Sequence, residues 1–360
     1  MVTENKHTSA ARLSIHITPE KVYSMLSPAV FLPGNSSRFD FTAARTACAL
    51  SLSAEDKREL GDNLSALGYG DIVFYDDMGF CIASRTRGNT LETAVVIRGT
   101  QGNEWYSNFE VGYSAEHSGF SKTADFIELR LSDYLFTRAI GTQPSFFVTG
   151  CSRGGAVANI LSKRLCERYG TDRVWGYTIA SPRVTISRNV TRFNCVFNLI
   201  RDEDFFTRLP LEGWGYQRYG RDITLKTADD FTERFGLISG EEYIGYVSPQ
   251  PVDTILCSMI KLAPNVHAYY ERRRQVGDRK MSLYEFLNSV ADILSDNTDE
   301  SSADIFVSAM VSDYADLLSF LSDGADLYEL IGSANGALRC SVADSHSPCA
   351  YIAALEGSRL

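Results

Sequence analysis

Ser152 lies at the centre of the pattern G-x-S-x-G, which runs from Gly150 to Gly154. An apolar run at 146–149 precedes it, and a helical pattern at 154–169 follows. At such a strand-to-helix turn the serine hydroxyl is exposed in a strained backbone, and glycines avoid clashes beside it. The spacing therefore predicts a nucleophilic serine, with the backbone amide of Arg153 donating to an oxyanion. An ordinary glycine-rich turn with a helix-capping serine is the open alternative.

A serine nucleophile needs a base, and the base needs an orienting acid. At turns of this kind the chain order is serine, then acid, then histidine. Two histidines follow Ser152, at His267 and His346. Asp202 and Asp204 come directly after an apolar run at 195–200, where an acid at a strand end is expected. His346 stands in a polar stretch that we interpret as a surface loop.

Short apolar runs alternate with helical patterns between residues 70 and 200, which predicts parallel βαβ units. The expected fold class is α/β, with a mostly parallel sheet flanked by helices and an additional C-terminal helical region. We expect an N-terminal extension at 1–40, a main domain at 41–280 and an acidic helical region at 281–360. The elements expected within the main domain are helices at 43–67, 122–140 and 154–169 and strands at 71–75, 79–84, 93–97, 146–149, 174–179 and 195–200.

The net charge of −10 is unevenly distributed. Residues 281–338 contain eleven acidic and no basic side chains, so the remaining chain is nearly neutral. A general nucleic-acid binder needs a basic face, and we expect no nucleic-acid partner. The basic cluster at 272–274 with Lys280 is interpreted as a solvated helix face, with peripheral contact to anionic headgroups as the alternative.

No run approaches the roughly 20 apolar residues of a membrane helix. The first residues show no basic start followed by an apolar stretch, so we expect no secretory signal and a cytoplasmic location, with non-classical export left open. The eight cysteines have no metal-ligand spacing, and free thiols are expected. A disulfide between Cys340 and Cys349 is the alternative.

Several ordered segments together resemble the class 3 lipases, the α/β-hydrolase family that contains the fungal triacylglycerol lipases. The resemblance covers roughly residues 45–272. Its segments are the oxyanion strand at 95–100, a lid-like stretch at 103–108, H-x-G-F at 117–120, the elbow at 150–155, A-x-P-R-V at 180–184, the acid segment at 204–210 and H-x-x-Y at 267–270.

The resemblance implies a nucleophile at Ser152, an orienting acid at Asp204 rather than Asp202, and a general base at His267. It places the oxyanion hole at the backbone amides of Thr100 and Arg153. His117 would be a packing or hydrogen-bonding residue. No cofactor or metal is implied, and Trp105, Tyr106 and Phe109 are left open as acyl-pocket or packing residues.

The chain departs from the family at Cys151, Arg153 and Phe206, where histidine, leucine and proline are usual. Cys151 is not expected to be a nucleophile. The resemblance implies a serine carboxylester hydrolase that forms an acyl-enzyme and acts on lipid or small acyl esters. The charge of Arg153 motivates a phospholipase or lysophospholipase as the first alternative. A non-catalytic binding protein of the same fold is the second.

Overall fold

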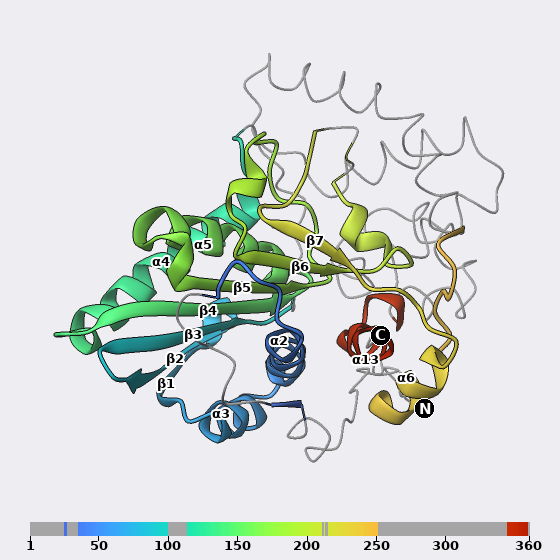
Figure 1. Ribbon diagram of the computed structural model, residues 1–360, viewed down its shortest axis with the longest axis horizontal. Helices are drawn as coiled ribbons and strands as arrows, with labels where there is room; N and C mark the ends of the chain where they lie inside the picture. Colours follow the sequence, from blue (N-terminus) through green and yellow to red (C-terminus); the bar gives the residue numbers. More distant parts are fainter. Residues whose placement is uncertain are drawn as a thin grey trace, which may run out of the picture.

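The computed structural model describes residues 25–26, 35–99, 114–210, 212, 215–250 and 344–358. Within these ranges seven strands form one sheet in sequential order (Figure 1). The strands are β1 (Gly70–Tyr75), β2 (Phe80–Arg87), β3 (Thr90–Ile97), β4 (Gln143–Cys151), β5 (Val174–Ile179), β6 (Val196–Ile200) and β7 (Arg221–Thr224).

The sheet is mostly parallel. β1, β2 and β3 pair antiparallel, and β3 to β7 pair parallel to one another. The connections from β3 to β4 and from β4 to β5 are helices, as parallel crossovers require. All six expected strands are present, and the expected α/β class with a mostly parallel sheet flanked by helices is confirmed. β7 was not predicted, because two of its four residues are charged and Ile223 is its one apolar residue.

Helices cover both faces of the sheet (Figure 1). α4 and α5 pack on one face with one apolar core. α2, α3, α6 and α13 contribute to a second core on the other face. Their bounds are α2 (Phe41–Ser53), α3 (Lys57–Ala66), α4 (Ser118–Arg138), α5 (Arg153–Tyr169), α6 (Phe231–Ser239) and α13 (Pro348–Gly357).

The helix expected at 43–67 is divided into α2 and α3. The break is encoded by Asp56, whose side chain accepts hydrogen bonds from the amides of Arg58 and Glu59 at 2.8 and 3.0 Å. A carboxylate in this position satisfies amides that have no partner within the helix. Asp56 therefore starts a new helix where the apolar periodicity alone suggested continuity.

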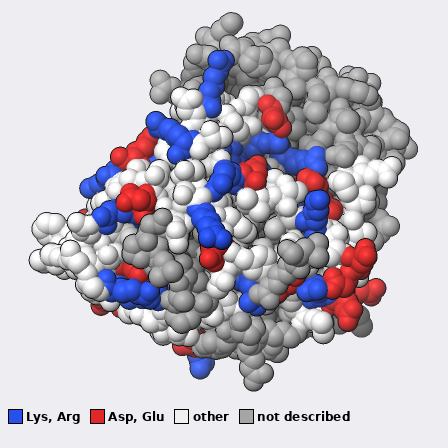
Figure 2. All heavy atoms as spheres, in the orientation of Figure 1, with Lys and Arg blue, Asp and Glu red and all other residues white. Residues whose placement is uncertain are grey.

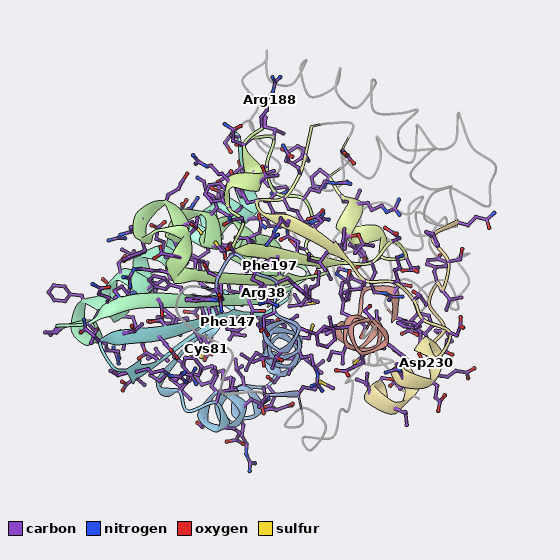
Figure 3. The ribbon with its side chains drawn as sticks, viewed as in Figure 1. Arg38, Cys81, Phe147, Arg188, Phe197 and Asp230 are labelled. Carbon is purple, nitrogen blue, oxygen red and sulfur yellow. The ribbon has the colours of Figure 1, made fainter. Side chains whose placement is uncertain are left out.

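β4 shows why the sequences of the central strands are uninterrupted apolar runs. Phe146 and Val148 join the core beneath α4 and α5, and Phe147 joins the core beneath α2. In Figure 3, Phe147 and Phe197 lie near α2, where both contact Tyr177. Successive side chains point to opposite faces, and a strand covered on both faces needs apolar residues at every position.

α13 returns the chain to the main body. It begins at Pro348, with Ser347 as its cap, and packs against α2 and α6 (Figure 1). Its residues from Cys349 to Leu355 are buried. The acidic helices expected at 282–294 and 303–321 lie outside the described residues, so the domain boundary at residue 280 stays a prediction.

On the face shown in Figure 2, basic and acidic side chains of the described residues are interspersed. This pattern agrees with the near-neutral charge of the main body. None of the helices among the described residues is long and apolar enough to cross a membrane.

Phe147 supplies the first test of this architecture. Phe147→Ala should lower the free energy of unfolding by about 3–5 kcal/mol, because it leaves a cavity between the sheet and α2. Chemical denaturation measures the change. Phe136 in α4 is 85% exposed, so Phe136→Ala should stay within about 0.5 kcal/mol of the parent. Equal losses in the two variants would contradict the placement of β4.

Candidate active site

Ser152 forms the turn between β4 and α5. Its backbone has φ 57° and ψ −126°, and positive φ is uncommon for a residue with a side chain. The amide of Ser152 donates to the carbonyl of Ile179 in β5 at 2.9 Å, and its carbonyl accepts from Ala156 in α5 at 3.0 Å. The strained turn expected from the sequence is present, and neighbouring backbone groups hold it in place.

The glycines beside Ser152 are required by backbone packing. A Cβ at Gly150 would lie 2.5 Å from the carbonyl oxygen of Gly154. A Cβ at Gly154 would lie 2.4 Å from the carbonyl oxygens of both Ile97 and Arg98. These contacts are with backbone, which cannot move aside as a flexible side chain can. The glycine at each position therefore lets α5 approach the end of β3.

The hydroxyl of Ser152 contacts a histidine. Ser152 Oγ lies 2.7 Å from Nε2 of His346, and Nδ1 of the same ring lies 2.8 and 2.9 Å from the two carboxylate oxygens of Asp204. A carboxylate only accepts, so Nδ1 carries a proton and donates to it. Nε2 of the neutral ring is then left to accept from the serine hydroxyl. This is the arrangement of a serine–histidine–acid triad.

The interpretation of His346 as a surface-loop residue is wrong. His346 is not a surface-loop residue, because its side chain is 15% exposed and contacts both Ser152 and Asp204. Its ring also lies 4.6 Å from that of Phe206. His267, which the resemblance implied as the base, lies outside the described residues. His346 satisfies the chain order equally well, and only its polar neighbours in the sequence argued against it.

Asp204 is fully buried, and its carboxylate accepts three kinds of donor. These are the amide of Phe206 at 3.0 Å, Nδ1 of His346 and the hydroxyl of Tyr351 at 2.6 Å. A buried carboxylate without donors would be costly, and these bonds offset that cost. Asp202 is exposed and pairs with Arg208. The preference for Asp204 over Asp202 thus agrees with the observed contacts.

The buried groups beside Asp204 keep their protons. Burial, followed by the negative charge of Asp204, holds the pKa of the Tyr351 hydroxyl well above its usual range. The same two causes, in the same order, raise the pKa of the Cys151 thiol. Tyr351 therefore stays a hydrogen-bond donor to Asp204. Cys151 stays a neutral thiol, which is a poor nucleophile.

One comparison with known proteins matches the segment that contains Ser152 and Asp204. Residues 94–214 match the family described as Lipase (class 3), a match that includes the elbow and Asp204. This segment is therefore similar to the class 3 lipases. The match spans about a third of the chain. No curated protein shows significant sequence similarity to the chain.

Fungal lipases are among the similar solved structures. A deletion mutant of Rhizomucor miehei lipase in a propeptide complex is 16% identical with a TM-score of 0.42, and the alignment covers 51% of this chain and 66% of that one. Lipase II from Rhizopus niveus is 14% identical with a TM-score of 0.37, covering 51% of this chain and 79% of that one. The chain thus spans slightly less than two thirds of the Rhizomucor structure.

The side chain of Arg153 is buried inside the fold. It is 5% exposed, and Nη2 donates to Thr123 Oγ1 in α4 at 2.8 Å. Its guanidinium therefore makes a buried contact within the fold. Its backbone amide is the first of α5, where helix amides and the helix dipole favour negative charge. The second expected oxyanion donor, Thr100, lies outside the described residues, as do Trp105, Tyr106 and Phe109.

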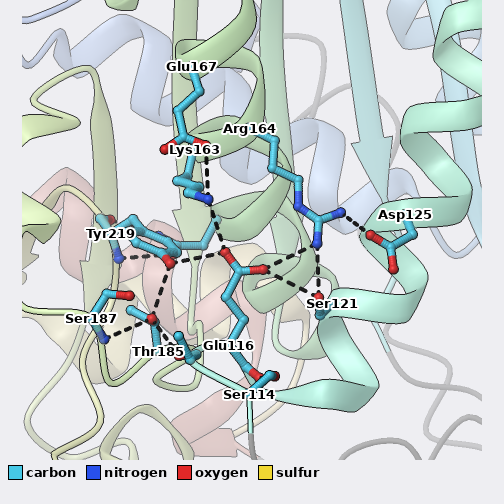
Figure 4. Close-up of polar contacts among 12 residues, drawn as sticks. Ser114, Glu116, Ser121, Asp125, Lys163, Arg164, Glu167, Thr185, Ser187 and Tyr219 are labelled. Carbon is cyan, nitrogen blue, oxygen red and sulfur yellow. Dashed lines mark hydrogen bonds and ion pairs between the residues drawn. The ribbon is translucent and has the colours of Figure 1, made fainter.

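The H-x-G-F motif at 117–120 starts α4. His117 is buried and its ring stacks on Phe120 at 4.0 Å, which confirms the expected packing role. Directly before it, Glu116 joins α4 to α5 (Figure 4). The Glu116 carboxylate lies 3.0 Å from the Tyr219 hydroxyl and pairs with Lys163 and Arg164 at 3.4 and 3.2 Å. These bonds fix the start of α4 against the helix that follows Ser152.

Gly154 supplies a test of the elbow. Gly154→Ala should abolish covalent labelling of Ser152 by a fluorophosphonate, because the added methyl group meets two backbone carbonyls. The labelled protein is measured by intact mass. As a control, a Cβ at Gly61 in α3 would meet nothing closer than 3.7 Å. Gly61→Ala should therefore label normally, and normal labelling of Gly154→Ala would refute the described backbone packing.

Proposed function

We propose that this protein is a serine carboxylester hydrolase that uses Ser152, His346 and Asp204. The hydrogen bond from Ser152 to His346, with Asp204 on the opposite ring nitrogen, is the observation that carries the proposal. A serine hydroxyl is a weak nucleophile unless a neighbouring base accepts its proton. Here Nε2 of His346 lies within hydrogen-bond distance of the Ser152 hydroxyl, and Asp204 orients the imidazole ring. Ser152 and His346 are therefore positioned for proton transfer.

In the proposed reaction, Ser152 Oγ attacks the ester carbonyl while His346 Nε2 takes its proton. Negative charge develops on the carbonyl oxygen, which accepts a hydrogen bond from the backbone amide of Arg153. One such donor typically stabilises the transition state by about 3–4 kcal/mol. We expect the Thr100 amide to be the second donor. His346 then returns the proton to the leaving alcohol, and an acyl-enzyme forms. Water attacks this ester, again with His346 as base, and releases the acid.

We propose lipid or other acyl esters as the substrate class, on the support of the class 3 lipase match. The phospholipase alternative was motivated by the charge of Arg153. Its guanidinium is buried against Thr123, so the described contacts do not favour phosphate recognition by this side chain. The non-catalytic alternative is disfavoured by the assembled triad, because a binding protein has no need of a serine–histidine–acid alignment.

The nucleophile is tested by a matched pair of adjacent residues. Ser152→Ala should reduce hydrolysis of a short p-nitrophenyl ester by about 10³-fold or more and abolish fluorophosphonate labelling. Cys151→Ala should keep most of the activity, because the buried thiol is neutral and makes no bond in the reaction. Activity that survives in Ser152→Ala but is lost in Cys151→Ala would overturn the assignment.

The base is tested by comparing the two histidines that follow Ser152. His346→Ala should lower kcat by about 10³-fold or more, because the proton of Ser152 loses its acceptor. His267→Ala should change kcat by less than about threefold if His346 is the base. Both rates are measured on the same ester, per mole of protein folded by circular dichroism. The reverse ranking would restore His267 as the base and reject His346.

A further inference from the structure

Arg201 is a fully buried arginine that the proposed reaction does not use. It follows β6 directly and stands three residues before Asp204. It is the largest of the fully buried side chains among the described residues. Burying a guanidinium removes it from water at high cost, so its contacts must offset that cost. The nature of those contacts shows what Arg201 holds in place.

The guanidinium of Arg201 bridges two segments that are distant in sequence. Nη1 donates to the carbonyl of Ser345 at 3.3 Å, and Nη2 donates to Thr227 Oγ1 at 3.3 Å. Nη2 also lies 3.6 Å from a carboxylate oxygen of Glu203, whose other oxygen accepts from Thr227 at 2.7 Å. The guanidinium carbon lies 4.4 Å from the ring centre of Phe231. Its charge is thus balanced within the fold.

The carbonyl that Arg201 binds is that of Ser345, the residue before His346. The backbone carbonyl of Arg201 also accepts from the amide of Asp204 at 3.1 Å. Arg201 therefore contacts the segment that contains Asp204 through its backbone, and it contacts the segment that contains His346 through its side chain. His346 lies 142 residues after Asp204, so the chain between them does little to fix their separation.

Other contacts hold the Ser345 segment to a different part of the protein. Asp344 accepts from the amide of Ile244 at 2.8 Å, and Ser345 Oγ accepts from the amide of Tyr246 at 2.9 Å. These bonds join it to the loop after α6, which carries no triad residue. Arg201 adds a restraint toward β6, the strand that leads into Asp204.

We propose that Arg201 is a positioning residue for the base, because it holds the backbone beside His346 at a set distance from Asp204. The inference rests on the proposed function of Ser152 and His346. A planar guanidinium donates in fixed directions, which suits it to hold a carbonyl in one place. Without it, the imidazole keeps its side-chain partners but loses a restraint on its backbone.

Arg85 is a matched control for a merely structural role. Its side chain is 9% exposed, donates to a backbone carbonyl (that of Leu67) and pairs with Glu92 at 2.6 Å. It also lies over an aromatic ring, that of Tyr69, at 4.6 Å. Arg85 lies in β2, and its partners are outside the triad. Arg85→Met and Arg201→Met thus remove similar bonds. Only Arg201→Met removes a bond to the segment that contains His346.

The experiment compares Arg201→Met, Arg201→Lys and Arg85→Met in the full chain. Thermal unfolding measures stability. The rate of fluorophosphonate labelling and kcat and KM on a p-nitrophenyl ester are measured per mole of folded protein. Arg201→Met should lower the labelling rate and kcat by about 10- to 100-fold, with KM within about twofold, because small displacements of a catalytic group are costly. Arg201→Lys should recover part of this loss, since it keeps one charged donor.

Arg85→Met should lose comparable stability and keep kcat within about twofold. Equal kcat in Arg201→Met and Arg85→Met would overturn the positioning role, as would an Arg201→Lys variant no better than Arg201→Met. If Arg201→Met does not fold, Arg201→Gln replaces it, and a kcat equal to that of Arg85→Met would reject the role. Absence of labelling in the parent protein, or labelling that survives Ser152→Ala, would instead reject the proposed function itself.

Discussion

The buried carboxylate of Asp204 is the group around which the site is organised. A carboxylate removed from water needs hydrogen-bond donors, and Asp204 receives them from Phe206, His346 and Tyr351. One donor is local, and the other two come from the segment that ends in α13. The need to satisfy this acid therefore brings the last described segment against the end of β6. The alignment of His346 with Ser152 follows from that docking.

The elbow imposes the second requirement, which is steric. Ser152 can occupy its strained turn because glycines at 150 and 154 let α5 contact the backbone at the end of β3. Backbone bonds from Ser152 to Ile179 and Ala156 then hold the turn between two neighbouring elements. The acid is fixed by hydrogen bonding and the nucleophile by close packing. The histidine joins these two independently held groups.

Most of the sheet and the nucleophile could be predicted from the sequence, because their signals are local. The elbow pattern, the apolar strands and the helix ending at Gly170 each depend on residues close together in the chain. The histidine could not be predicted in this way. His346 stands among polar residues that are typical of a surface loop. It contacts Asp204, and the preceding Ser345 contacts Arg201 and Tyr243, all more than 100 residues away in the sequence. Tyr351 was missed for the same reason, since α13 gives no sign of the acid that it contacts.

The distance in sequence between acid and base also has a consequence for synthesis. Chains emerge from the ribosome at roughly 5–20 residues per second, so His346 follows Asp204 by about 7–28 s. During that interval the strands and the elbow are already available to fold, and the serine has no proton acceptor in place. In the nascent protein the serine nucleophile would thus not yet be activated by a base. Under the proposed function, Ser152 gains its proton acceptor only after the segment that contains His346 has been synthesised and has packed against Asp204.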